Sequence, residues 1–251
     1  MNISFYTAAV GAQQQQERLD VHANNIANVN TNGFRAKIPS FSALMTGPVT
    51  GIEEDLPRGV GSRLIDADTD FRSAGITGTN RPLDFAIEGD GFFALVDPAT
   101  GEIAYTRDGS FTLSEHVETI EGDKETESTQ VTKWYLSDGM GRFVLNRYGQ
   151  PLEITETQND ELMDADIPVG IFDFVNYNGM ESNSENRLTP VAKNGQVGLS
   201  SAKLIQGYLE LSNADLANEL AKVIESQRSF QYMLRMVTTS DEIETTVNNL
   251  R

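Results

Sequence analysis

Three aspartates, Asp66, Asp68 and Asp70, alternate along the chain like the first ligands of a calcium-binding EF-hand loop. Such a loop requires a glycine at its sixth position and a glutamate at its twelfth. The chain has Phe71 and Thr77 at these positions. The calcium signature therefore fails, and we expect a solvated turn here.

Other residue types that could do chemistry are equally scattered. The two histidines, His22 and His116, have no nearby ligand cluster, so they predict no zinc site, and we expect His22 beside a helix stripe at an interface or on the surface. The Gly89-Asp-Gly91 turn lacks the lysine and hydroxyl residue of a phosphate loop, and we expect it to reverse the chain tightly before Phe92.

Enzymatic signatures are also missing. There is no cysteine to serve as nucleophile or thiolate ligand, and no Gly-x-Ser-x-Gly elbow of a serine hydrolase. The 37 acidic residues include no pair that the sequence singles out for glycoside hydrolysis. We therefore predict no catalytic, metal or cofactor-binding residue, and no enzyme.

The net negative charge of the chain disfavours some classes of binding partner. The 251 residues carry 37 Asp and Glu against 19 Lys and Arg, a formal charge of −18, which disfavours nucleic acid and anionic membranes. No apolar run approaches the ~20 residues of a membrane span. The N-terminus has no basic leader, so we expect no cleavable signal, and any export would need a route without signal cleavage.

Both ends of the chain have helical periodicity. In the N-terminal segment, stripe positions step by four and three, which places them on one helix face: Phe5, Ala9, Ala12, Gln16, Leu19, Ala23 and Ile26. The C-terminal segment has a longer stripe, continued after a phase shift by Ile243, Val247 and Leu250: Leu216, Leu220, Val223, Gln227, Phe230, Leu234 and Val237. Ser212 and Asp215 form a capping-box pattern, predicting one helix of up to about 39 residues that starts at Ser212.

The middle predicts strands. Short apolar runs at residues 85–87, 92–96 and 170–175 lie between glycine-rich turns, and the acidic residues of about 114–133 indicate an exposed loop or a long hairpin. The predicted fold is α+β, with long N- and C-terminal helices pairing as a coiled-coil-like layer around a β-rich middle domain. Residues 1–35 with 212–251 form the helical assembly domain, 36–80 an extended linker or rod segment, and 81–211 the β-rich domain.

Two narrow amphipathic helices depend on packing for their stability. They can pair with each other and with further copies, and an interface that does not close into a ring yields a helical filament. Alternatively, they cap their own β-rich body as a hairpin, as in a secreted, monomeric binding protein. Periodicity alone leaves both possibilities open.

Four motifs, in order along the chain, resemble the flagellar basal-body rod and hook family. The first runs from Leu19 through Asn-Asn-Ile-Ala-Asn-Val-Asn-Thr-Asn-Gly to Phe34, and the second from Thr79 through Asn-Arg-Pro-Leu-Asp to Phe93. The third is Tyr-Thr-Arg-Asp-Gly-Ser-Phe at 105–111, and the last comprises Gln-Gly-Tyr-Leu-Glu-Leu-Ser-Asn at 206–213 with the helix that follows.

The resemblance implies a structural subunit of the rod that polymerises into the axial drive shaft, with other rod and hook proteins as partners and no cofactor. It also implies delivery by the flagellar type III export apparatus without leader cleavage, and terminal helices that become ordered on assembly as an inner layer inside the β domain. Length favours a rod protein over a hook protein, a distal one first and a proximal one second. The acidic stretch from Glu115 to Lys133 departs from the family pattern.

The residues that we predict to be functionally important are therefore those that form contacts on assembly. Asn24, Asn25 and Asn28 offer amides that could fix helix register, as a buried asparagine does in coiled coils, although they could equally form a merely polar face. The predicted assembly interface is Phe5, Leu19, Asn24, Asn25, Ile26, Asn28, Leu216, Leu220, Val223, Phe230 and Leu234.

Overall fold

The computed structural model describes residues 3–46, 58–120, 129–154, 167–183 and 186–250. The chain divides into two compact units. Unit 1 comprises residues 1–29, 36–70 and 214–251, and unit 2 comprises residues 30–35 and 71–213. An N-terminal helix, a β-rich middle and a C-terminal helix follow one another, so the α+β class is confirmed.

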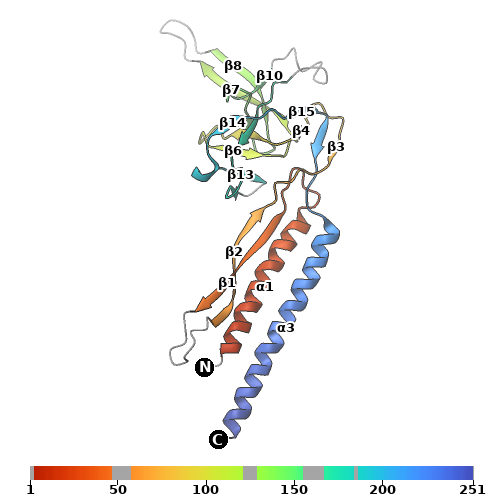
Figure 1. Ribbon diagram of the computed structural model, residues 1–251. Coiled ribbons are helices and arrows are strands. Elements are labelled where there is room, and N and C mark those ends of the chain that lie inside the picture. Colours follow the sequence, from red (N-terminus) through yellow and green to blue (C-terminus); the bar gives the residue numbers. More distant parts are fainter. Residues whose placement is uncertain (1–2, 47–57, 121–128, 155–166, 184–185, 251) are drawn as a thin grey trace. The chain divides into compact units, whose positions relative to one another are not determined.

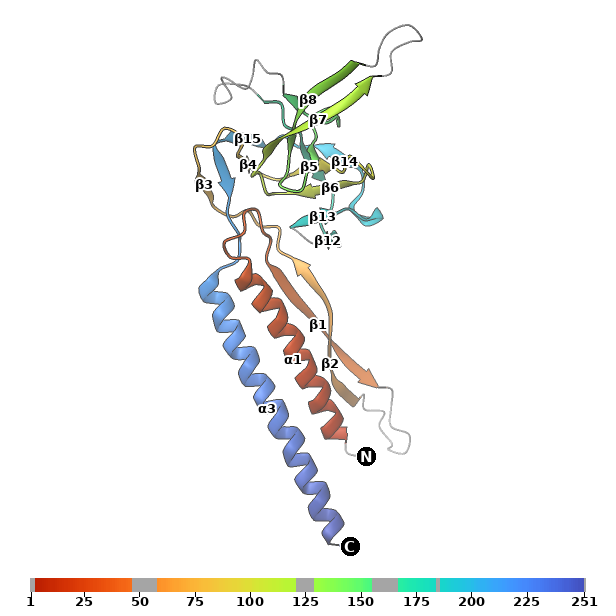
Figure 2. The ribbon, with the colours of Figure 1, turned by 180° about the vertical axis from the view of Figure 1, so that it is seen from behind.

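Unit 1 has three layers (Figures 1 and 2). The helix α1 (Ile3–Ala27) lies in the middle, with α3 (Leu216–Asn249) on one side and the hairpin of β1 (Lys37–Thr46) and β2 (Arg58–Thr69) on the other. The two helices run antiparallel, since Ser4 near the start of α1 meets Ser240 late in α3.

The C-terminal helix begins later than the sequence predicts. Its N-cap is Asp215, whose side chain accepts a hydrogen bond from the amide of Ala217. The prediction of a start at Ser212 was wrong because the backbone before the helix is already engaged: the amides of Leu211 and Asn213 donate to the carbonyls of Gly75 and Phe34.

The β1–β2 hairpin occupies much of the segment expected as a linker. Its antiparallel register pairs Lys37 with Thr69 and contains two irregularities. Asp66 and Asp68 lie in β2, opposite Ser40 and Ile38. The expectation of a solvated turn there was wrong, because the alternating aspartates follow the alternation of a strand.

Unit 2 is built from short antiparallel strands. Its largest sheet has the order β10-β8-β9-β5-β6-β13-β12, with β7 pairing β8 and with β11 pairing β5 and β14. Two further pairs, β15 with β4 and β16 with β3, complete the unit. The bounds are β3 Ile76–Gly78, β4 Phe85–Glu88, β5 Phe92–Val96, β6 Ile103–Thr106, β7 Thr112–Ile120, β8 Thr129–Ser137, β9 Phe143–Val144, β10 Glu153–Ile154, β11 Ile171–Phe174, β12 Glu181–Asn183, β13 Arg187–Thr189, β14 Val197–Leu199, β15 Lys203–Gln206 and β16 Tyr208–Glu210, with the 3-10 turn η1 at Ala192–Asn194.

Predicted strands in the middle are confirmed as β4, β5 and β11, whose residues form two buried clusters. One contains Phe93, Phe111 and Leu136, and the other surrounds Phe92 and Phe174. The acidic stretch forms the β7–β8 hairpin, and its central residues 121–128 lie outside the described residues. The Gly89-Asp-Gly91 segment joins β4 to β5, but these strands pair with β15 and with β6, β9 and β11, so it is a bend and not the expected reversal.

Candidate assembly interface

The contact between α1 and α3 joins small residues of α1 to a mixed apolar and polar face of α3. On α1, Ala8, Gly11 and Ala12 are buried. On α3 the inward residues step by four and three, which keeps them on one face: Glu219, Val223, Ser226, Phe230, Met233, Val237 and Ser240. The helices come close where a residue of α1 has no side chain, since Gly11 faces Met233.

A buried polar cluster closes this contact at the end of α1. Its centre is Glu219, whose Oε2 lies 2.7 Å from Nδ1 of His22 and accepts from Nδ2 of Asn25 at 3.1 Å. The other oxygen accepts from Nζ of Lys222 at 2.9 Å. Asn25 also bonds both backbone groups of Lys37, donating to its carbonyl at 2.8 Å and accepting from its amide at 2.9 Å. The cluster therefore links both helices and β1.

Electrostatics in the cluster favour the ionised glutamate. Burial by itself would raise the pKa of the Glu219 carboxyl, but the hydrogen bonds from Lys222, Asn25 and His22 outweigh it and hold that pKa below its ordinary value. Of the two places expected for His22, an interface or the surface, the surface is wrong, and the residue lies in the contact between α1 and α3. It is 1% exposed within the chain, because its imidazole has an ionised partner on α3.

The structure distributes the predicted asparagines differently. Asn25 is fully buried and its amide bonds are satisfied inside unit 1. Asn24 is exposed, and its carbonyl accepts from the side chain of Asn28 at 2.9 Å. Of the three asparagines, Asn25 is therefore the one that is buried within this chain.

The predicted apolar residues fall into two groups. Phe5, Leu19, Ile26, Val223 and Phe230 are half-buried in unit 1. By contrast, Leu216, Leu220 and Leu234 remain 44–46% exposed. Together with Ile224 they form what we call the outer leucine face of α3, since their spacing by four and ten residues keeps them on one side of the helix.

Two further apolar surfaces of unit 1 are exposed. Every residue of α3 after Ser240 is exposed, including Ile243 and Val247, so residues 241–249 extend about 13 Å of helix past the Ser4 contact. On the hairpin, the exposed large side chains are Ile38, Phe41, Leu44 and Ile65. Large exposed apolar surfaces of this kind mark interaction sites.

Two further observations concern metal ligands and membrane spans in the described ranges. There, no group of three or more His, Asp or Glu side chains could hold a metal ion. Likewise, no helix among these residues is both long and apolar enough to cross a membrane.

Comparison with known proteins follows the same division of the chain. The family described as "Flagella basal body rod protein" matches residues 5–35, and "Flagellar basal body rod FlgEFG protein C-terminal" matches residues 205–250. The middle, at residues 86–127, matches "Flagellar hook protein FlgE/F/G D1 domain".

Whole-length relatives agree. The flagellar basal-body rod protein FlgG of Bacillus subtilis is 32% identical over 279 residues, covering 99% of this chain and 98% of the relative. The chain belongs to the flagellar basal-body rod protein family. FlgG of Borreliella burgdorferi is 30% identical over 266 residues (99% and 98% covered), and that of Buchnera aphidicola from Schizaphis graminum 29% over 263 residues (96% of each).

Within the flagellar rod family the chain is similar to the distal rod protein FlgG. It is a structural subunit of the flagellar basal-body rod and is located in the basal body. The alternative of a secreted, monomeric binding protein is not favoured by these relatives. The sequence had indicated this family through four motifs, of which three lie in the matched ranges and the second, at 79–93, overlaps one of them.

Several contact residues were not predicted from sequence. An apolar stripe does not include glycine, serine or glutamate, so the stripes did not predict these contact residues: Gly11, Glu219, Ser226 and Ser240. One signal could have found those on α3: Glu219, Ser226, Met233 and Ser240 repeat every seven residues, which places them on one face of the helix.

Proposed function

We propose that this rod subunit polymerises through unit 1, with the outer leucine face of α3 as its principal contact with neighbouring copies. In the rod, α1 and α3 then form a coiled-coil-like inner layer, with the β-rich domain outside it. This assembly domain would include the β1–β2 hairpin in addition to the terminal segments 1–35 and 212–251 predicted from sequence.

The main support for this proposal is that α1 covers one face of α3 and leaves another face exposed. α1 packs on the face with Glu219, Ser226 and Ser240, while Leu216, Leu220, Ile224 and Leu234 stay about half exposed. Burying the remainder of four such side chains would contribute on the order of several kcal/mol. If this face served to stabilise the fold of its own chain, it would be packed against α1.

The hairpin supplies a second, non-identical surface. The hairpin lies across α1 from α3 (Figure 2), and its exposed large side chains include Ile38, Phe41, Leu44 and Ile65. Contact between two different surfaces is heterologous, and a heterologous contact that does not close produces an open helical assembly. Unit 1 therefore has the features that a tubular polymer requires.

Partners and export follow from family membership. We expect other axial rod and hook proteins to contact the assembled subunit, and the flagellar type III apparatus to deliver it. We expect neither nucleic acid nor membrane insertion, in keeping with the charge of −18. The role is structural, without catalysis or cofactor.

Leu220→Asp tests this function. The variant places a charge on the outer leucine face, so it should stop incorporation into rods, while circular dichroism and melting of the monomer stay close to wild type because Leu220 is about half exposed. Incorporation is measured by complementing a strain that lacks the gene and isolating basal bodies.

A matched control is Leu199→Asp, which changes an exposed leucine of β14 in unit 2. It should leave rod formation intact if the contact surface is on α3. Normal incorporation of Leu220→Asp would rule out this face as the principal contact.

A further inference from the structure

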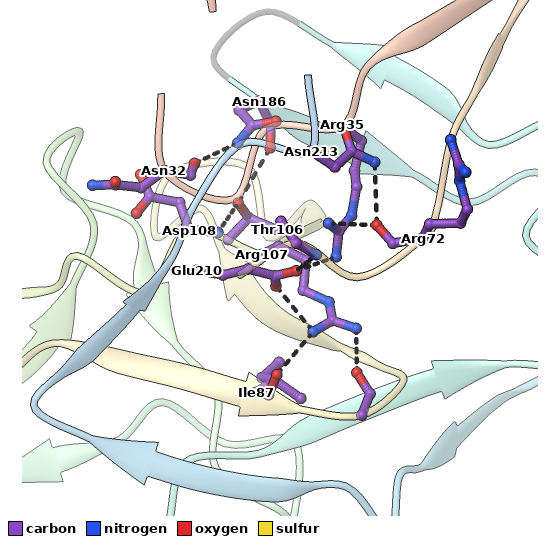
Figure 3. Close-up of polar contacts among 12 residues, drawn as sticks. Asn32, Arg35, Arg72, Ile87, Thr106, Arg107, Asp108, Asn186, Glu210 and Asn213 are labelled. Carbon is purple, nitrogen blue, oxygen red and sulfur yellow. Dashed lines mark hydrogen bonds and ion pairs between the residues drawn. The ribbon is translucent and has the colours of Figure 1, made fainter. Parts of the chain in front are cut away.

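A buried ion cluster joins three distant parts of unit 2 (Figure 3). It consists of Arg35, Arg107 and Glu210, which are at most 5% exposed. Glu210 lies at its centre: Oε1 accepts from Nη2 of Arg35 at 2.7 Å, and Oε2 accepts from Nη1 of Arg107 at 3.1 Å. One carboxylate thus holds two guanidinium groups from segments far apart in the sequence.

The arginines extend the cluster into the β-rich structure. Arg107 donates to the carbonyls of Ile87 at 3.3 Å and Gly89 at 2.6 Å, and its guanidinium carbon lies 5.6 Å from the ring centroid of Phe92. Arg35 donates to the carbonyl of Arg72 at 3.1 Å. Arg107 is thereby fixed to the β4–β5 connection beside the core.

Glu210 also holds the chain segments that adjoin the helices. Residues 30–35 follow the α1 segment, and residues 210–213 precede the cap of α3. Two backbone hydrogen bonds join these segments to each other. The amide of Gly33 donates to the carbonyl of Glu210 at 2.8 Å, and the amide of Asn213 donates to the carbonyl of Phe34 at 3.3 Å. The carboxylate fastens the joined pair to Arg107.

We propose that the Arg35–Glu210–Arg107 cluster transmits force between the β-rich unit and the two chain segments that leave it, with Glu210 as the positioning residue. The proposal rests on the chain's place in a rotating rod. Both connections converge on one carboxylate, so torque carried by either segment reaches the core of unit 2 through charge-assisted hydrogen bonds, which are stronger than neutral ones. The segment before α3 also bonds to the rest of unit 2 through the pairing of β16 with β3 and through the amide of Leu211 to the carbonyl of Gly75, and the carboxylate adds charge-assisted bonds to these.

The net charge of the cluster predicts a different order of damage among variants than the size of the side-chain change does. Two arginines and one glutamate leave a buried charge of +1. Burial lowers the pKa of Arg107 while the Glu210 carboxylate opposes that shift, as expected for a cation that depends on its partner. Glu210→Gln raises the buried charge to +2, whereas Arg35→Met lowers it to zero and retains the Arg107–Glu210 pair. The smaller side-chain change should therefore do the greater damage.

Hydrogen exchange of the full-length chain provides the first test. In Glu210→Gln, peptides covering 30–35 and 207–213 should exchange about tenfold to a hundredfold faster, the equivalent of one or two lost charge-assisted bonds. Peptides covering β8 and β9 should keep wild-type protection. Arg35→Met should show the same local pattern with a smaller increase.

Leu136→Ala is the control for general loss of stability, because Leu136 is fully buried in the core of β8. Acceleration spread across unit 2 in Glu210→Gln, as in this control, would overturn the proposal. So would equal or greater damage from Arg35→Met. If Glu210→Gln does not fold, the local or general pattern in Arg35→Met decides in the same way.

Rotation under load is the second readout. Cells with Glu210→Gln should build rods, since unit 1 is unchanged, but fewer of their flagella should keep turning in viscous medium than in cells with Leu136→Ala. Normal rotation under load would overturn force transmission through Glu210. This outcome is separate from the Leu220→Asp test, which concerns assembly and can fail without affecting the exchange result.

Discussion

Gly11 of α1 lies so close to Met233 of α3 that a Cβ atom at residue 11 would come within 3.2 Å of the thioether sulfur. The glycine therefore sets how closely the two helices approach. At this point of the contact, the absence of a side chain on α1 leaves room for the Met233 side chain of α3.

Gly11→Leu should destabilise the helix pair. The added side chain has to displace Met233 or separate the helices, and overpacking of this kind costs about 1–3 kcal/mol. Thermal unfolding followed by circular dichroism should show the loss. Ala23→Leu, at an exposed position of the same helix, is the control and should be near neutral, so equal melting temperatures for the two variants would contradict a close helix contact at residue 11.

Glu219→Gln should change how stability depends on pH. Because the folded pKa of Glu219 lies below its ordinary value, the ionised carboxylate contributes stability above the unfolded pKa, and this contribution is lost as the pH falls below about 4. The variant should be about 1–3 kcal/mol less stable at pH 7 and should lose less between pH 5 and pH 3.

Denaturant unfolding at several pH values measures both effects. Glu225→Gln is the control because Glu225 is an exposed residue of the same helix, 3.7 Å from Arg18. A wild-type acid profile in Glu219→Gln would show that the buried cluster does not couple stability to pH.

Helices and strands were largely predictable because their signals are local. Both terminal helices follow from stripes with steps of four and three, and β4, β5 and β11 follow from short apolar runs. The β1–β2 hairpin was missed because its first strand, containing Pro39 and several serines, has little apolar alternation. Its stability comes partly from α1, where the side chain of Gln14 accepts from the amide of Leu64.

The buried clusters could not be predicted, because their members are distant in sequence. His22 and Glu219 are 197 residues apart, and Arg35 and Glu210 are 175 apart. Composition and spacing say nothing about which of the 37 acidic residues meets which base. The motifs did contain Arg107 and Glu210, and Arg35 directly follows the first motif, but their joint role becomes visible only when the fold brings them together.

Removal of residues 241–251 should separate folding from assembly. All helical residues after Ser240 are exposed, so their loss removes few contacts of the chain with itself, and the melting temperature of the monomer should stay within a few degrees of wild type. Incorporation into basal bodies should fail, because the exposed apolar side chains of Ile243 and Val247 are then missing from the contact with neighbouring subunits. A large fall in melting temperature, or normal incorporation, would contradict this.

Gly33→Ala should destabilise unit 2 by more than a backbone penalty alone. Gly33 has φ +64°, and a Cβ atom there would come within 2.5 Å of the backbone of Arg107, which cannot move aside. Gly101 has a similar φ of +73° but nothing within 4 Å, so Gly101→Ala measures the left-handed conformation by itself, at about 1–2 kcal/mol. Gly33→Ala should cost about 2 kcal/mol more, since the clash adds strain to the segment that carries Arg35. Denaturant unfolding of both variants compares them directly, and equal losses would mean that the segment at Gly33 can move away from Arg107 without consequence.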